Sequence, residues 1–366
     1  MNLIQQQKNN LEKYIKLESN LTINGNVLPA VNTLEKYFIN EDVDIYKLFK
    51  IISKRQFNLD IKNKLQLNQL AVLKTKSKIN FIDEDGWKKD PLFNEYSKYK
   101  KDVIGGAKFP PIIITHPNVL KDYTKIKNIE NYSYNVDGMH RIMSFLEAGK
   151  KEIETYVIVR RVDLKNYITS KDINEINRLG SLCTWFPRYQ EIREVGLTGQ
   201  RVQVPRYTEI YDFSNLKDKV VVDFGGNLGQ AAIEAYFNGA KKIYNFDYQK
   251  CVVDTSKKIS DVLGLGIVNN TIDFNLPSFE SNVMNVVSNW DWTIYQAIYR
   301  TKEIKDVKKS FKFIVNKTKE GLYFEGNGAA NIDTPEFYDN VFKPFKFKDV
   351  KYLGHSQLRP AYKIKK

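Results

Sequence analysis

Cysteine is nearly absent from this sequence, with Cys183 and Cys251 as the only two among 366 residues. Two cysteines are too few for a disulfide framework, and they do not form the C-x-x-C spacing of a zinc or redox site. A disulfide-stapled miniprotein is therefore excluded, and the low cysteine use indicates a reducing compartment.

Histidines and long apolar segments are scarce as well. The three histidines, His116, His140 and His355, never stand at helical spacing, which excludes an H-E-x-x-H metal site. The first 20 residues lack the apolar core of a signal peptide, and no segment approaches the roughly 18 apolar residues of a membrane span. We therefore predict a cytoplasmic protein without a protein-built transition-metal centre and without a membrane span.

The composition is that of a folded protein, with 42% hydrophobic, 13% aromatic and 27% charged residues. A chain of 366 residues has material for two domains with separate cores. The formal net charge of +14 is spread over both halves. It suits a polyanionic partner such as nucleic acid, nucleotides, phosphorylated glycans or anionic lipid, but the codon bias of an AT-rich genome explains it equally well.

Apolar patterns divide the chain into four segments. Residues 1–80 are expected to form a helical extension, with Leu67, Leu70 and Leu73 near helical spacing. Residues 81–175 form a smaller α+β domain, residues 176–215 a linker, and residues 216–366 an α/β domain. The smaller domain has expected strands at 111–115, 132–136 and 154–162 and a helix at 139–146, ended by Gly149.

Strands and helices alternate from residue 218 onward, which predicts a parallel sheet covered on both faces. The expected strands are 219–224, 242–247, 266–274, 283–288 and 321–326, and the expected helices are 228–238, 249–263, 295–315 and 335–342. The last two strands, 347–354 and 359–365, have no helix between them and are expected to pair as an antiparallel hairpin.

A glycine-rich turn follows the first strand of this domain, in the segment V-V-V-D-F-G-G-N-L-G-Q that begins at Val220. Such a turn brings the backbone and the N-terminus of a helix against a ligand. Asp247 ends the next strand, where a carboxylate accepts hydrogen bonds from the hydroxyls of an adenosine ribose. NAD and S-adenosylmethionine both fit this pattern, but the acid Asp223 at the strand end suits a cationic ligand better than a pyrophosphate.

With these motifs and the terminal hairpin, residues 185–366 resemble the class I S-adenosylmethionine-dependent methyltransferases, which implies a Rossmann-like sheet. The resemblance implies that Asp247 binds the ribose and Asp273 the adenine amino group. Arg206 and Tyr207 are candidate partners for the methionine carboxylate, the alternative for Arg206 being a solvated charge in a linker. The remaining cofactor-binding candidates are Asp223, Gly225, Gly226, Asn227, Gly229 and Asn289.

The loop at residues 288–292, which would follow the fourth strand, departs from the N-P-P-Y pattern of methyltransferases that act on amino groups of bases. For a hydroxyl acceptor, Asp291, Glu325 and His355 are candidate general bases, each with an ordinary surface role as the alternative. A phosphate acceptor would need no base.

A second candidate site lies at Asp137-Gly138-Met139-His140-Arg141, between a strand and a helix. Gly138 permits a tight turn, and the helix N-terminus with His140 and Arg141 offers donors to a phosphate. A solvated arginine and a core histidine are the alternative. Residues 103–162 here resemble the ParB/sulfiredoxin superfamily, which implies that this turn binds the phosphates of ATP or CTP with Mg²⁺ and makes His140 a catalytic candidate.

For a kinase of this superfamily, the upstream catalytic acid has no matching motif, and Asp83, Glu84, Asp85 and Glu95 are all candidates. The leading hypothesis is a methyltransferase acting on a hydroxyl or phosphate of a small molecule or glycan, with a nucleotide-binding domain that is a kinase or only a substrate clamp. The alternative is a phage or plasmid methyltransferase that modifies nucleic acid and uses a ParB-like domain to bind DNA or CTP.

Overall fold

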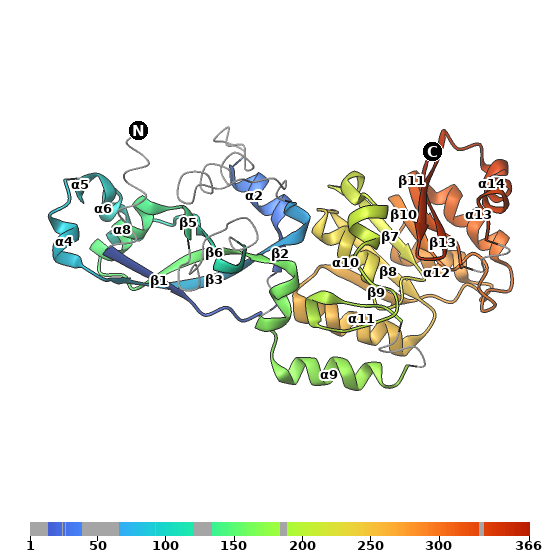
Figure 1. The fold of residues 1–366 in the computed structure, drawn as a ribbon, viewed down its shortest axis with the longest axis horizontal. Helices are drawn as coiled ribbons and strands as arrows, with labels where there is room; N and C mark the ends of the chain where they lie inside the picture. Colours follow the sequence, from blue (N-terminus) through green and yellow to red (C-terminus); the bar gives the residue numbers. More distant parts are fainter. Residues whose placement is uncertain are drawn as a thin grey trace. The chain divides into compact units, whose positions relative to one another are not determined.

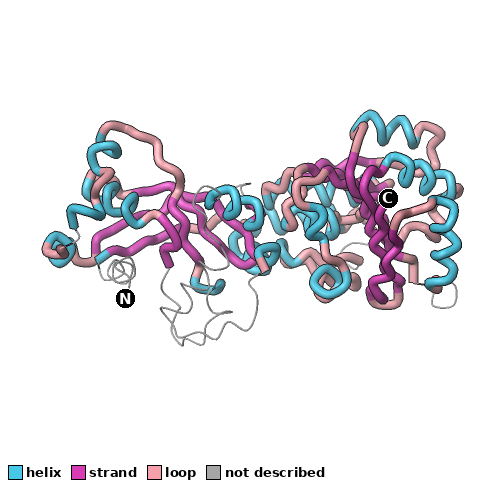
Figure 2. Tube along the Cα trace, turned by 90° about the horizontal axis from the view of Figure 1, so that it is seen from above, coloured by secondary structure: helices cyan, strands magenta, loops and turns pink. Residues whose placement is uncertain are grey.

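A computed structural model of the chain describes residues 14–23, 25, 27–38, 66–91, 93–119, 134–183, 189–328 and 333–366. The chain divides into two compact units, unit 1 (Met1–Asp163) and unit 2 (Leu164–Lys366). Each unit contains one sheet and its own helices, and Figure 2 shows the strands of each sheet side by side. The division lies at residue 163, between the boundaries expected at 80 and 175.

Unit 1 is built on a six-stranded mixed sheet in the order β1-β3-β6-β4-β5, with β2 paired to β3. Its strands are β1 (Ile15–Ser19), β2 (Val27–Pro29), β3 (Leu70–Phe81), β4 (Ile112–Thr115), β5 (Tyr134–Asp137) and β6 (Glu152–Arg160). Its helices are α2 (Ala30–Phe38), η1 (Leu67–Gln69), α4 (Glu84–Lys88), α5 (Phe93–Tyr96), α6 (Lys100–Ile104), α8 (Met139–Glu147) and η3 (Arg161–Tyr167), the last of which crosses the division between the units. The core beneath α2 joins Leu34 to Val72 of β3 and Ile158 of β6.

The helix expected around Leu67–Leu73 is wrong, because residues 70–81 form the long strand β3. All four residues of its first part, L-A-V-L, are buried, as in a strand covered on both faces. The exposed Lys74, Lys76 and Lys78 then alternate with less exposed residues, and this two-residue period was the signal for a strand. Strands β1 and β3 therefore belong to the same sheet as β4, β5 and β6, not to a separate extension.

Unit 2 contains a seven-stranded sheet in the order β12-β13-β11-β10-β7-β8-β9. Its strands are β7 (Val220–Phe224), β8 (Lys242–Asp247), β9 (Ile267–Thr271), β10 (Trp290–Gln296), β11 (Thr318–Glu325), β12 (Asp349–Ser356) and β13 (Arg359–Lys365). Strands β7 to β11 are parallel, and β13 lies antiparallel between β11 and β12. The expected α/β fold with an antiparallel terminal hairpin is confirmed.

Helices cover both faces of this sheet (Figure 1). They are α10 (Gln230–Phe237), α11 (Lys250–Leu263), α12 (Phe279–Val286), α13 (Val307–Lys317) and α14 (Pro335–Phe342). Helix α9 (Ser170–Gly180) packs against α11. Phe224, Phe246 and Phe324 pack into one aromatic core with α12, α13 and α14. The residues that alternate with them along the strands face the opposite side of the sheet. One of these, Asn245 of β8, donates to Ser256 of α11 over 3.0 Å. The short helices η4 (Arg193–Val195), η5 (Arg206–Ile210), η6 (Phe213–Leu216) and η7 (Lys343–Phe345) complete the unit.

One strand of unit 2 was misplaced by the sequence pattern. The strand expected at 283–288 is wrong, since Phe279–Val286 is helix α12 and the fourth strand, β10, begins at Trp290. Buried Phe279 and Val283 stand at helical spacing, and their β-branched neighbours suggested a strand. The helix expected from residue 295 begins only at Val307, where Asp306 caps it by accepting from the Lys309 amide.

No helix in the described part of the chain combines the length and the apolar composition needed to span a bilayer.

Candidate functional site

The carboxyl ends of β7, β8 and β10 surround a pocket with a volume of about 190 Å³. Its lining residues are Tyr189, Gly225, Asn227, Asp247, Tyr248, Gln249, Asp273, Phe274, Asn275, Gln296, Ala297, Ile298, Thr301, Glu303 and Ile304. A smaller compartment shares Tyr189, Gly225, Gln296 and Ala297 with it and reaches deeper to Asp223 and Arg206. The two compartments form one cleft at the position where open parallel sheets bind ligands.

The glycine-rich turn after β7 forms as expected and gives the cleft its floor. Gly225 has a φ of +68°, in the left-handed region that glycine favours. A Cβ on Gly226 would collide with Asn245 Oδ1 and with the Asp223 carboxylate. The absence of side chains at this turn leaves the Asp223 carboxylate accessible from the smaller compartment.

Asp223 is a buried acid with an unused acceptor. Its residue is only 1% exposed, and its Oδ2 atom has no hydrogen-bond partner among the described residues. Burial raises the pKa of Asp223 to about 7, the nearby Asp247 adds to this rise, and the Arg206 guanidinium opposes it. A buried carboxylate oxygen without a partner is costly. A cationic group in the smaller compartment would satisfy it.

Asp247 ends β8, as predicted, and it lines the larger compartment. Its Oδ2 accepts from the Asn227 amide over 3.1 Å and its Oδ1 from the Gln249 amide over 3.0 Å. Burial raises the pKa of Asp247, and these amides act against that rise. Each carboxylate oxygen keeps a second lone pair, so the pair can accept from two neighbouring hydroxyls of a ribose.

Asp273 lies beyond Asp247 in the same compartment. Its Oδ1 accepts from the Asn275 amide over 2.8 Å, and Asn275 Nδ2 donates to the Glu303 carbonyl over 2.6 Å. Phe274 stacks on Phe279 with ring centroids 4.9 Å apart. This end of the cleft therefore combines a flat aromatic wall with carboxylate and amide groups, which suits a heteroaromatic base with amino groups.

Arg206 is buried in the smaller compartment and is not a solvated charge in a linker. It is 6% exposed and donates to Gln230 Oε1 over 2.9 Å, to Gln296 Oε1 over 2.8 Å and to Glu325 Oε2 over 3.1 Å. These bonds use three of its five N–H donors. Tyr207, also buried, donates to Gln296 Oε1 over 2.9 Å and does not line the cleft.

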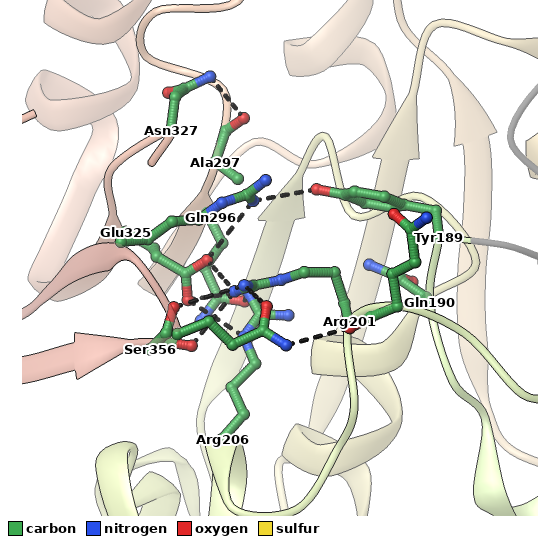
Figure 3. A network of polar contacts seen from close by, with 12 residues as sticks. Tyr189, Gln190, Arg201, Arg206, Gln296, Ala297, Glu325, Asn327 and Ser356 are labelled. Atoms are coloured by element: carbon green, nitrogen blue, oxygen red, sulfur yellow. Dashed lines mark hydrogen bonds and ion pairs between the residues drawn. The ribbon is translucent and has the colours of Figure 1, made fainter. Parts of the chain in front are cut away.

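Glu325, a candidate base, is the centre of a polar network (Figure 3). It is fully buried, and its two oxygens lie 2.5 Å from Arg201 Nη2 and 3.0 Å from Arg206 Nη2. The Tyr211 hydroxyl donates to it over 3.2 Å. A carboxylate whose lone pairs are committed to two guanidinium groups does not suit proton abstraction. The structure therefore assigns Glu325 to holding arginines and not to base catalysis.

Two predicted site residues lie at the wrong edge of the sheet. Asn289 precedes β10 and Asp291 is its second residue, so both lie at the amino end of the strand. Asp291 Oδ2 accepts from the amide of Val220, the first residue of β7, over 2.9 Å. The prediction failed because the fourth strand was placed seven residues too early. The residues that do reach the cleft are Gln296, the last of β10, and Ala297 and Ile298 after it.

His355, the third candidate base, is exposed on β12, where its Nδ1 lies 2.6 Å from the Tyr352 hydroxyl. It lines neither compartment.

Several cleft residues were missed from the sequence. The lining residues among them are Tyr189, Gln190, Gln296 and Ala297. Arg201 and Arg359, also missed, line neither compartment and pair with Glu325. Placing the strand on the run W-D-W-T-I-Y would have identified Gln296 at its end. No local pattern marks Arg201, because its partner Glu325 is 124 residues away in the chain.

The turn before α8 in unit 1 forms as predicted, but one of its residues has a different role. Gly138 has a φ of +110°, and a Cβ there would collide with Ile112. Arg141 points inward and donates to the carbonyls of Pro110 and Pro111 over 2.5 and 2.8 Å and to Asp137. Arg141 and Asp137 thus bind each other and the fold in this geometry, and their role as phosphate ligands stays a prediction.

The remaining residues of this turn, Met139 and His140, are partly exposed in the first turn of α8. The His140 ring lies edge-on to Tyr99, with centroids 6.5 Å apart. The candidate upstream acids Asp83, Glu84, Asp85 and Glu95 are all exposed, and Asp83 caps α4 by accepting from the Gly86 amide over 2.8 Å.

No family model and no curated protein matches the chain. Among solved structures, it is similar to SMU.776, described as a methyltransferase and solved with SAH, with a TM-score of 0.35 and 17% identity over 42% of this chain and 47% of that one. It is similar to a protein from Streptococcus mutans described as a SAM-dependent methyltransferase, with a TM-score of 0.37 and 15% identity over 46% of this chain and 51% of that one.

A third similar structure is WbdD, also solved with the kinase inhibitor LY294002, with a TM-score of 0.36 and 16% identity over 52% of this chain and 46% of that one. The chain spans about half the length of these three proteins.

Proposed function

We propose that unit 2 is an S-adenosylmethionine-dependent methyltransferase. The observation that carries this proposal is the buried Oδ2 of Asp223, which has no hydrogen-bond partner in the described part of the chain. It lies beside the glycine-rich turn, one strand away from Asp247. The ligand that satisfies both acids carries a cationic group next to a ribose. S-adenosylmethionine has this combination, whereas the pyrophosphate of a dinucleotide would bring negative charge to Asp223.

The residues of the cleft would share the cofactor among them. Asp247 would accept from the ribose hydroxyls, and Asp273 with Phe274 would hold the adenine. Asp223 would face the ammonium group, and Arg206 would use its remaining donors for the carboxylate. When bound, the cofactor supplies an electrophilic methyl group, and the main task of the protein is to align an acceptor with it.

We propose a hydroxyl or phosphate oxygen of a small molecule or glycan as the acceptor. The donor side chains of the described lining suit an acceptor oxygen, and the phosphate oxygen is the one of the two that would need no base. The nucleic-acid alternative predicts duplex DNA binding that weakens steeply with salt. Absence of DNA binding at low salt would remove that alternative.

For unit 1, nucleotide binding stays a prediction from the resemblance, with ATP or CTP and Mg²⁺ as the ligands. Its strand, glycine turn and helix are present, but Arg141 is committed to the fold. Any phosphate contact would therefore rest on the backbone amides of the first turn of α8 and on His140.

The cofactor assignment is tested by calorimetric titration with S-adenosylhomocysteine and, separately, with NAD. We expect S-adenosylhomocysteine to bind. The substitution Asp247→Ala should weaken its affinity about 100-fold or more, because hydrogen bonds to a charged group contribute about 1.5–3 kcal/mol each. The control is Asp254→Ala on the exposed side of α11, where the carboxylate pairs with Lys250 at 2.9 Å. Binding of NAD alone, or equal binding by the Asp247 variant, would refute the assignment.

A further inference from the structure

Next to the smaller compartment, which Arg206 and Asp223 line, three arginines share one carboxylate. Three guanidinium groups, from Arg201, Arg206 and Arg359, lie 2.5, 3.0 and 3.7 Å from the oxygens of the single carboxylate of Glu325. Arg201 and Arg206 are 5% and 6% exposed. Since one carboxylate neutralises one guanidinium and buried charge is costly without a partner, this group of residues favours anionic ligands.

Arg359 lines neither compartment, but it contacts a residue that lines both, and it is the most exposed of the three arginines. It is the first residue of β13, and its Nη1 donates over 3.1 Å to the hydroxyl of Tyr189, which lines both compartments. Its side chain is 18% exposed, so it can be reached from solvent, and it lies farthest of the three arginines from Glu325. Arg201 and Arg206 are already engaged by that carboxylate at closer range.

Gln296 supplies a second donor at the same place. Its Oε1 accepts from both Arg206 and Tyr207, which orients the amide with Nε2 as the remaining group. That Nε2 has no hydrogen-bond partner among the described residues, although Gln296 is only 8% exposed and lines both compartments. A buried N–H donor of this kind needs an acceptor oxygen from a ligand.

Each acidic residue of the described cleft lining already has another partner or another proposed ligand group. Asp223, Asp247 and Asp273 face the proposed cofactor, and Glu303 accepts from the Thr301 hydroxyl near Asn275. The acceptor side therefore offers the donors Gln296, Tyr189 and Arg359, without a group positioned to remove a proton.

We propose that the methyl acceptor is an oxyanion, a phosphate monoester or a carboxylate, held by Arg359, Gln296 Nε2 and the Tyr189 hydroxyl. This inference rests on the proposed methyltransferase function. In the step, an ionised oxygen of the acceptor forms a bond to the methyl carbon while the carbon–sulfur bond breaks. The electron pair of that bond stays on sulfur and no proton is transferred, so no general base is required.

The test uses the full chain saturated with S-adenosylhomocysteine and titrated with phenyl phosphate, benzoate or benzyl alcohol. Binding of phenyl phosphate or of benzoate supports the inference. Which of the two binds shows whether the acceptor is a phosphate monoester or a carboxylate. Binding of benzyl alcohol alone, or of none of the three, overturns it. Failure of the first titration, with S-adenosylhomocysteine itself, would instead refute the proposed function.

Two variants and a control locate the binding. Arg359→Gln should weaken oxyanion binding at least tenfold while S-adenosylhomocysteine binds within about twofold of the wild type. Gln296→Glu keeps an oxygen for Arg206 and Tyr207 but brings a negative charge to the acceptor side, so it should abolish oxyanion binding. This second variant keeps the inference testable if Arg359→Gln folds poorly. Arg178→Gln removes the same charge from exposed α9, where Arg178 pairs with Glu175, and should change nothing. Equal oxyanion affinity in all three variants would overturn the inference.

Discussion

Arg206 and Glu325 lie 119 residues apart in the chain, and Arg206 Nε donates to Glu325 Oε2 over 3.1 Å in the interior of unit 2. The bond joins η5, which precedes the first strand of the sheet, to the carboxyl end of β11. The same carboxylate holds Arg201. The segment before the sheet is thereby fixed against the cleft that it helps to form.

Replacing Glu325 with Gln should destabilise the protein by about 3–5 kcal/mol, because it leaves two buried guanidinium groups without a counter-charge. The free energy of unfolding from urea titration measures this. Glu320→Gln is the control, since Glu320 is 39% exposed in its pair with Lys219 and such pairs contribute about 0–1 kcal/mol. A loss below about 1 kcal/mol at Glu325 would contradict the network's role.

Asp223 should make the stability of the protein depend on pH. Its pKa is about 7 in the folded protein, above the value near 3.9 of an exposed Asp, so between these values the folded state binds more protons. Stability should therefore fall as pH rises from about 4 to 7. Asp223→Asn, which removes the buried charge, should stabilise the ligand-free protein at pH 8 by up to about 4 kcal/mol and by much less at pH 5.

Urea titrations of the wild type and Asp223→Asn at pH 5, 6, 7 and 8 measure this difference. Asp254→Asn serves as the control, because Asp254 is partly exposed on α11. If Asp223→Asn raised the free energy of unfolding by the same amount at every pH, this would contradict the raised pKa of Asp223.

Gly226→Ala should abolish binding of S-adenosylhomocysteine, because the added Cβ collides with Asn245 and with the Asp223 carboxylate. The turn must move to relieve the collision, and small displacements in a binding site cost affinity steeply. Gly266→Ala, where a Cβ meets nothing within 4 Å, is the matched control. Calorimetry on both variants gives the comparison, and undiminished binding by Gly226→Ala would show that the turn does not contact the ligand.

Arg141→Met should lower the stability of unit 1 by about 2–4 kcal/mol, because the carbonyls of Pro110 and Pro111 and the Asp137 carboxylate lose their donor. Urea unfolding followed by the fluorescence of Trp87, the only tryptophan of unit 1, reports on this unit. A role as a phosphate ligand predicts the opposite pattern, in which nucleotide binding is lost and stability is unchanged.

Local patterns were enough to predict the α/β architecture of unit 2 and part of the lining of its cleft. Strand β8 and helix α14 have the predicted limits, and the turn at Gly225 and Gly226 lies where its glycines indicated. These features depend on residues close in the chain, such as a buried run ended by an acid and followed by glycines. The fourth strand failed because a short β-branched run does not by itself distinguish a strand from a buried helix.

The sequence by itself determined the order of strands and helices in unit 2 and the acids at the ends of β7 and β8, because hydrophobic periodicity and turn chemistry act over a few residues. Only the tertiary structure decided which groups surround Glu325, Arg359 and Gln296. Their partners come from distant segments, and whether a carboxylate acts as a base or holds arginines depends on what packing brings within hydrogen-bond distance of it.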